Sequence, residues 1–335
     1  MARSNAHPLL CTLDGLLVIP PEHHRPDTDR DDAAAMLACD QAALTALVRA
    51  GLPATGEPGG ERFDSRDIFN LALYSGSGHT GIERTVASAL RWTRSSCEDL
   101  IAPRMSRFEL RVACGAPDGC HPGARNSLAR PRTGAYGGRV RHVRAHPAGA
   151  ARNVPAGTAA TARASGPALT LSAVLRTVGD CPVLRAPALR AIMREFMGAE
   201  LRWLRLPEAM RNDESLIPRG FASCGSASRY IARLCREEGI PARTRIGWLV
   251  GLPDLVHAWV EVEDVDGVTK VIDPTFVLLA EVIPGANPML RDPGLGFRTN
   301  RLVPTALEVG ADIASHTCDA GHMPRVTTTL VPLRC

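Results

Sequence analysis

Cys224 stands where a nucleophilic cysteine would be expected. It lies between small residues in the string SCGSASRYIARLC, directly before an amphipathic pattern. At the first turn of a helix, unpaired backbone N–H groups and the helix dipole favour an anion. A thiolate in that position is expected to have a depressed pKa and to be reactive. The alternative is a small buried residue at a helix start, and the helix pattern alone leaves both interpretations open.

A nucleophilic cysteine needs a base, and the base needs a group that orients it. His257 opens the pattern HAWVEVED, and Asp273 closes the pattern VTKVID that follows. The string DVDG between them indicates a turn, so an antiparallel hairpin would bring both residues to one edge of a sheet. A two-residue turn would put the two side chains on opposite faces. An odd loop or a bulge would place them directly opposite each other on one face, and we predict this second arrangement.

The elements that must position these residues follow from the periodicity. After Cys224, apolar side chains recur at helical spacing until Gly239 and Pro241 end the helix. Cys235 lies on that apolar stripe and is predicted to be part of the core. Strand patterns then follow in the strings RTRIGWLVG, HAWVEVED and VTKVIDPTF. This order predicts an α+β domain in which helices pack on an antiparallel sheet.

The strings SCGSASRYIARLCREEGIPARTRIGW, HAWVEVED and IDPTF resemble, in this order, the core of the transglutaminase-like superfamily of papain-like enzymes. The resemblance implies Cys224 as nucleophile, His257 as general base and acid, and Asp273 as the residue that orients the histidine. It implies neither a metal nor an organic cofactor. The family often places a Trp or Gln side chain upstream of the cysteine to bind the oxyanion. LIPRGFAS offers neither, so the backbone N–H of Cys224 is the one donor that we expect.

Composition divides the chain into three predicted parts. Residues 1–112 carry helix patterns and are predicted to be a mainly helical region of unknown role, and residues 167–335 to be the transglutaminase-like catalytic domain. Between residues 115 and 166 there are eight arginines against one acid, Asp118, and no Glu, Lys, Ile, Phe, Met or Trp. Residues 113–166 are therefore expected to be a linker or a disordered insertion, or a stretch of GC-rich DNA translated in the wrong frame.

Two further signals in the sequence are weak. Cys114, Cys120 and His121 lie close together without a second cysteine pair, which is little support for a zinc site. The net charge of +4 is small for 335 residues and does not indicate a nucleic-acid partner. The ten cysteines are scattered, and we find neither a clean signal sequence nor a run near the ~18 apolar residues of a spanning helix. A bacterial cytoplasm without membrane contact is therefore expected.

The triad predicts acyl transfer through a thioester acyl-enzyme. We expect amide-bond formation on a small-molecule or carrier-bound substrate. The partners would be an acyl donor and an amine or water acceptor, with a carrier protein if the substrate is carrier-bound. A cysteine peptidase or amidase that uses water on the same triad is the first alternative. A non-catalytic binding module of the same fold is the second. The choice depends on what reaches the thioester and how well water is excluded.

Overall fold

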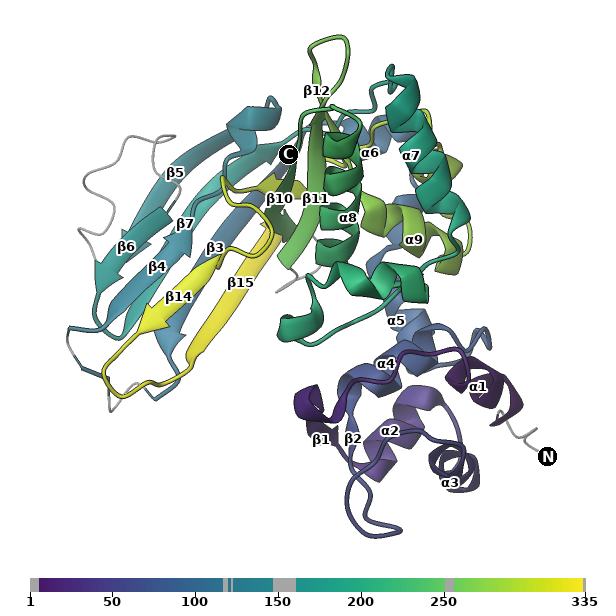
Figure 1. The fold of residues 1–335 in the computed structure, drawn as a ribbon. Helices are drawn as coiled ribbons and strands as arrows, with labels where there is room; N and C mark the ends of the chain where they lie inside the picture. Colours follow the sequence, from purple (N-terminus) through teal and green to yellow (C-terminus); the bar gives the residue numbers. More distant parts are fainter. Residues whose placement is uncertain (1–5, 117–119, 122, 147–160, 251–255, 334–335) are drawn as a thin grey trace.

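The computed structural model describes residues 6–116, 120–121, 123–146, 161–250 and 256–333 of the chain. Figure 1 shows a group of short helices, a pair of sheets, and a third sheet with helices packed on it. The predicted α+β fold, with helices on an antiparallel sheet and a mainly helical N-terminal region, is confirmed. Among the described residues, no helix has the length and apolar character needed to cross a membrane.

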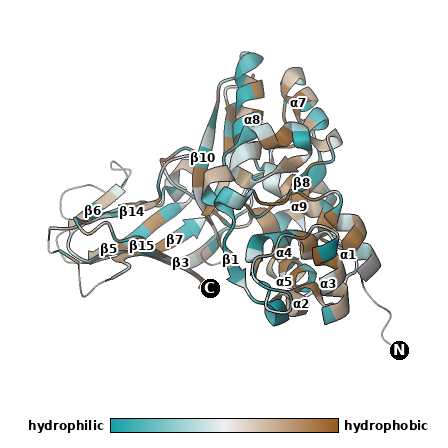
Figure 2. Cartoon of the chain, turned by 60° about the horizontal axis from the view of Figure 1, so that its bottom comes forward, coloured by the Kyte–Doolittle hydropathy of each residue, from teal (hydrophilic) through white to brown (hydrophobic). Residues whose placement is uncertain are grey.

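The N-terminal region packs five short helices around one apolar core. They are α1 (Ala6–Leu13), α2 (Arg30–Leu37), α3 (Gln41–Arg49), α4 (Ser65–Leu73) and α5 (Gly81–Ala89), accompanied by β1 (Pro26–Thr28) and β2 (Phe63–Asp64). Figure 2 shows hydrophobic and hydrophilic residues together on these helices, as amphipathic helices around a shared core require. Asn70 of α4 exchanges two hydrogen bonds with the backbone of Arg205, at 2.8 and 3.0 Å, and so ties this region to the rest of the chain.

Two antiparallel sheets share a second core. One has the strand order β15-β3-β7-β5 and the other β14-β4-β6. Their strands are β3 (Arg104–Cys114), β4 (Arg125–Ala129), β5 (Arg139–His146), β6 (Thr161–Ser165), β7 (Ala168–Thr177), β14 (Ala314–Thr317) and β15 (Pro324–Pro332). Alternate residues of β3 and β7 are buried in this core, as in a sandwich of two sheets. The last two strands return from the C-terminal end of the chain to lie beside β4 and β3 (Figure 1).

The segment 113–166 differs from the predicted linker or disordered insertion wherever the structure describes it. It supplies β4, β5 and β6, and the side chains of Leu128 and Ala162 are buried. The physical reason is that each strand needs only one apolar face, because β3, β7 and β14 supply the opposing part of the core. The composition of the segment alone does not reveal this shared burial. The parts of the prediction at residues 117–119, 122 and 147–160 lie outside the described residues.

The third group of elements is an antiparallel sheet, in the order β12-β11-β10-β13, with helices on it. Its main elements are α7 (Pro187–Gly198), α8 (Cys224–Glu237), β10 (Ala242–Leu249), β11 (Val256–Glu263), β12 (Thr269–Ile272), α9 (Pro274–Val282) and β13 (Leu302–Pro304). Helices α7 and α8 pack with Val260 on one face, while Trp259 on the other face packs with Phe276 of α9. Residues 259 and 260 point to opposite faces because side chains alternate along a strand.

Short elements fill the connections. They are α6 (Cys97–Ile101), the parallel pair β8 (Arg202–Trp203) and β9 (Phe221–Ala222), and the 3-10 helices η1 (Pro21–His23), η2 (Arg91–Arg94), η4 (Thr133–Tyr136), η5 (Glu208–Met210), η6 (Glu214–Arg219) and η7 (Pro288–Arg291). Helix α8 ends at Glu237, ahead of Gly239 with φ 72°, which is the end that the sequence predicted.

Candidate active site

Cys224 is the first residue of α8. The hydroxyl of Ser223 accepts the backbone N–H of Ser226 at 3.1 Å, and the hydroxyl of Ser226 accepts the N–H of Ser223 at 2.8 Å. This capping box fixes the helix start and with it the position of Cys224 in the first turn. Cys224 is half-buried, whereas Cys235 is fully buried between α8 and the sheet, and burial raises the pKa of its thiol to about 12. The prediction that Cys235 belongs to the core is confirmed.

His257 and Asp273 form a buried pair. The two residues are 2% and 4% exposed, and Nε2 of His257 lies 2.7 Å from Oδ2 of Asp273. Burial works against a charged imidazole, but the carboxylate of Asp273 and the neighbouring Cys224 raise the pKa of His257 to about 10. The arrangement therefore places a strongly basic imidazole next to Cys224.

The hairpin register puts His257 and Asp273 on one face of the sheet, as predicted, but not directly opposite each other. The paired residues of β11 and β12 are Val260–Ile272, Glu261–Val271, Val262–Lys270 and Glu263–Thr269. Residues 264–268 form the loop, which has the odd length that the prediction required. If the register is continued, Asp273 falls across from Trp259, one diagonal step from His257.

Asp273 is the N-cap of α9 as well as the partner of His257. Its Oδ1 accepts the backbone N–H of Thr275 at 3.2 Å, while its Oδ2 faces the imidazole. The two bonds together fix the orientation of the carboxylate. The ring of Phe276 lies 5.4 Å from that of His257, centroid to centroid. Because Nε2 is engaged by Asp273, Nδ1 is the nitrogen of His257 that remains to exchange a proton with Cys224.

A buried hydrogen-bond network supports the histidine from behind. The ring of Trp259 lies 6.0 Å from that of His257, and its Nε1 donates to the hydroxyl of Tyr136 at 2.8 Å. Tyr136 in turn donates to Oε1 of Glu261, and Arg245 binds both oxygens of that carboxylate at 2.7 and 3.1 Å. Burial would raise the pKa of Glu261, but Arg245 and Tyr136 hold it below its usual value. Tyr136 belongs to the segment that was expected to be a linker.

Cys224 and His257 line one small pocket of about 70 Å³. Its other lining residues are Glu208, Arg211, Asn212, Gly225, Ile246, Val256, Ala258, Val309, Gly310, Ala311 and Asp312. A larger cavity of about 360 Å³ lies on the sandwich, lined by Met105, Val174 and three arginines. That cavity contains no nucleophile, so the small pocket is the candidate active site.

Three residues of the pocket were missed by sequence reasoning: Glu208, Asn212 and Asp312. Asn212 presses against the start of α8, because a Cβ at Gly225 would come within 2.1 Å of its Oδ1. Its amide is thus held next to Cys224, where a Trp or Gln had been sought in the nearer string LIPRGFAS. The polar type of Asn212 and its place upstream of the cysteine were the available signals. Nothing local marks Glu208 or Asp312.

Comparisons with known proteins agree with this description of the core. Residues 188–268 match the family model described as the transglutaminase-like superfamily, so the predicted resemblance is confirmed. The matched range contains Cys224 and His257 and ends before Asp273. The match supports a cysteine-based enzyme family. A search of curated proteins found no significant match.

Two solved structures are similar to the chain. A candidate cysteine protease from Cytophaga hutchinsonii is 11% identical, with 70% of this chain and 92% of that chain covered and a TM-score of 0.40. The periplasmic domain of TgpA from Pseudomonas aeruginosa, solved with bound ethylmercury, is 14% identical, with 59% and 96% covered and a TM-score of 0.25.

Proposed function

Since residues 188–268 belong to the transglutaminase-like superfamily, we propose that the chain is a cysteine acyltransferase. Cys224 is the nucleophile, His257 the base and acid, and Asp273 the carboxylate that orients the imidazole. The observation that supports this most is the buried pair of His257 and Asp273, 2.7 Å apart, beside the pocket of Cys224. Burying such a pair costs desolvation energy, so a charged pair that also faces a half-buried cysteine suggests a catalytic use.

The first half of the reaction forms the acyl-enzyme. The proton of Cys224 moves to Nδ1 of His257, and the thiolate attacks the acyl carbon of an amide or thioester donor. The carbonyl oxygen becomes an oxyanion as the carbon–sulfur bond forms. His257 then donates the proton to the leaving amine or thiol as its bond to the acyl carbon breaks, which leaves a thioester on Cys224.

The oxyanion needs donors at the helix start. The backbone N–H of Cys224 is one, because the first N–H groups of α8 have no partner within the helix. We propose the side-chain amide of Asn212 as the second, since Asn212 lines the same pocket and contacts the helix start at Gly225. This replaces the Trp or Gln that the resemblance had called for.

In the second half an amine attacks the thioester and gives a new amide. His257 takes the proton of the amine, and Cys224 leaves as the thiolate. Glu208 and Asp312 line the pocket, and their carboxylates would attract a protonated amine to its mouth. These two acids favour amide-bond formation, on a small-molecule or carrier-bound substrate, over hydrolysis. We place the reaction in a bacterial cytoplasm, on the scattered cysteines of the sequence.

A cysteine peptidase or amidase is the alternative, because water can attack the same thioester. A binding module without catalysis is the second alternative. Incubation with an activated acyl ester, followed by intact-mass and peptide mapping, tests all three. We expect an acyl adduct on Cys224 in the wild type and in Cys39→Ser, which changes a cysteine of the N-terminal region, and none at that position in Cys224→Ala.

The fate of the adduct separates the reactions. Faster loss of the acyl group with added amines, and amide formed in proportion, would support the transferase. Loss at the same rate with and without amines would support the hydrolase. If the wild type gains no more acyl groups than Cys224→Ala, the proposed nucleophile is wrong.

A further inference from the structure

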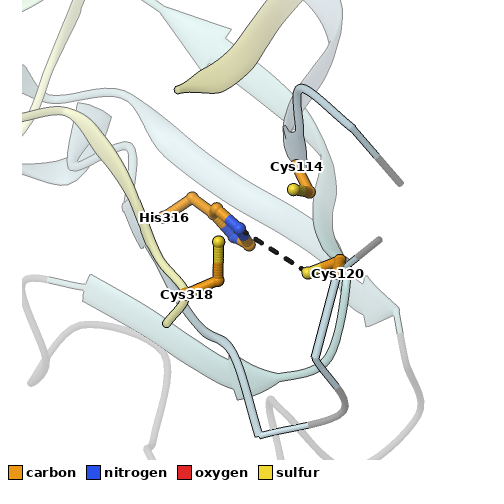
Figure 3. A group of neighbouring side chains, drawn as sticks. All are labelled: Cys114, Cys120, His316 and Cys318. Carbon is orange, nitrogen blue, oxygen red and sulfur yellow. Dashed lines mark hydrogen bonds between the residues drawn. The ribbon is translucent and has the colours of Figure 1, made fainter. Parts of the chain in front are cut away.

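Four metal-binding side chains meet at one end of the sandwich, away from the pocket of Cys224. Cys114 ends β3, Cys120 lies in the connection to β4, His316 lies in β14, and Cys318 follows that strand. Their ligand atoms all lie within 4.8 Å of one another. Figure 3 shows the three sulfurs and the imidazole turned toward a common centre. Cys114, His316 and Cys318 are buried, and Cys120 is half-buried.

The tautomer of His316 is fixed in the form that a metal requires. His316 and Asn126 are directly paired across β14 and β4, and Nδ1 of His316 lies 2.8 Å from Oδ1 of Asn126. The amide of Asn126 donates through Nδ2 to the carbonyl oxygen of Gly166 at 2.7 Å, so its Oδ1 must accept. His316 therefore carries its proton on Nδ1. The lone pair of Nε2 faces Cys120 Sγ at 3.7 Å, and metal-bound histidines usually have such a partner on the other nitrogen.

The separation of these atoms suits tetrahedral coordination. Zinc binds sulfur at about 2.3 Å and imidazole nitrogen at about 2.0 Å, which puts a sulfur and a nitrogen about 3.5 Å apart in a tetrahedron. The observed distance from Cys120 Sγ to His316 Nε2 is 3.7 Å. A disulfide explains the cluster less well, because three cysteines cannot all pair and the oriented lone pair of His316 would have no partner.

We propose that Cys114, Cys120, His316 and Cys318 bind a zinc ion. Three thiolates and a neutral imidazole are the ligand set of structural zinc sites, and four protein ligands leave no open position for catalysis. Binding releases the thiol protons to solvent. His322, whose Nδ1 lies 3.4 Å from Cys114 Sγ, is placed to donate a hydrogen bond to one thiolate and offset its charge.

The ion would join two distant parts of the chain. Cys114 and Cys120 lie where the chain passes from one sheet to the other, and His316 and Cys318 lie at the start of the return from β14 to β15. Among the residues that the structure describes, the apolar cluster at this end of the sandwich is small and consists of Ala124 with the cysteines. A metal therefore replaces core packing there. His121, the neighbour that the sequence suggested, is directed elsewhere: its Nδ1 accepts the backbone N–H of Gly123 at 3.0 Å.

Native mass spectrometry and elemental analysis of the reduced, full-length protein test the proposal. We expect one zinc per chain in the wild type, in Cys39→Ser and in Cys224→Ala, and loss of zinc in Cys114→Ser and Cys318→Ser. Retention in Cys224→Ala is needed because the catalytic thiol could also capture zinc. A wild type that neither contains zinc nor takes it up, equal zinc in wild type and Cys114→Ser, or a disulfide within the cluster would each overturn the proposal.

Two measurements remain decisive if the cysteine variants fail to fold. Cobalt added to the metal-free wild type should give the absorption bands of a tetrahedral site with thiolate ligands, and an octahedral spectrum would contradict the ligand set. Asn126→Leu keeps all four ligands but removes the acceptor of His316, so zinc affinity should fall about 10–100-fold. An unchanged affinity in that variant would overturn the role of Asn126 in fixing the tautomer of His316 for the metal.

Discussion

Tyr136→Phe tests whether the sandwich supports the active site. The hydroxyl of Tyr136 accepts from Trp259 and donates to Glu261, and all three side chains are buried. Removal of this hydroxyl leaves Nε1 of Trp259 without an acceptor. It also takes one hydrogen bond from the carboxylate of Glu261, which still pairs with Arg245 and Arg243. A buried polar group left without a partner costs about 1–3 kcal/mol, so the two losses together should lower the free energy of unfolding by about 3 kcal/mol.

The other two tyrosines of the chain are matched controls for this change. Tyr74 donates one hydrogen bond, to the backbone carbonyl of Trp203 at 2.9 Å, so Tyr74→Phe should cost about 1 kcal/mol. The side chain of Tyr230 is half-buried on α8, where its ring packs against Arg233, so Tyr230→Phe should cost less than about 0.5 kcal/mol. Urea unfolding at neutral pH measures all three.

If Tyr136→Phe is no more destabilising than Tyr230→Phe, the hydrogen bonds of Tyr136 do not stabilise the fold in the way that we infer. A second readout is acylation of Cys224 by the acyl probe. Because Trp259 lies beside His257, the Tyr136 variant should acylate more slowly than the Tyr74 variant under conditions where both are folded.

Three further predictions follow from the site and the cluster. Asp273→Asn should slow acylation of Cys224 by roughly 10²–10⁴-fold. The same variant should also be less stable than the wild type. Because the folded pKa of His257 is raised from 6.5 to about 10, this loss of stability should be greatest near pH 6 and shrink as the pH rises toward 10. Gly225→Ala should abolish labelling or folding, since its Cβ would come within 2.7 Å of the backbone oxygen of Arg211, whereas Gly198→Ala, with open space around it, should be neutral or stabilising. Thermal unfolding and acyl labelling of the two glycine variants check this prediction. Wild-type behaviour of Gly225→Ala would contradict the close contact of Gly225 with Arg211 and Asn212. Under reducing conditions a chelator should lower the Tm of the wild type and leave the Tm of Cys114→Ser unchanged. The effect should be large, because zinc at 1,000 times its Kd adds about 4 kcal/mol to the free energy of unfolding.

The core of the candidate site could be predicted because its signals are local. Cys224 follows its cap and precedes its helix, and His257 and Asp273 belong to one hairpin. The odd length of the loop between β11 and β12 could be predicted, because His257 and Asp273 must lie on one face of the sheet. Which residues of the two strands pair could not be predicted. Asp273 leaves the strand to cap α9, which is a demand of the helix that the strand pattern does not show.

The missed features depend on tertiary contacts that no local pattern shows. Tyr136 meets Glu261 across the boundary between the sandwich and the core, and Asn212 is held at the start of α8 by packing against Gly225. The proposed zinc site needs His316 and Cys318, which lie about 200 residues after Cys114 in the sequence. A search for short cysteine pairs cannot find a site whose ligands are brought together by strand pairing.

The segment 113–166 shows why low apolar content did not prevent order in its described parts. Its strands bury small residues such as Ala129 and Ala162 against larger side chains from β3 and β7, so the segment uses apolar surface that it does not itself provide. The hydroxyl of Tyr136 and the thiols of Cys114 and Cys120 add contacts that do not depend on apolar area. A segment translated in the wrong frame would have no reason to place polar groups against matching partners in β11 and β14, so these contacts indicate that the segment is a working part of the protein.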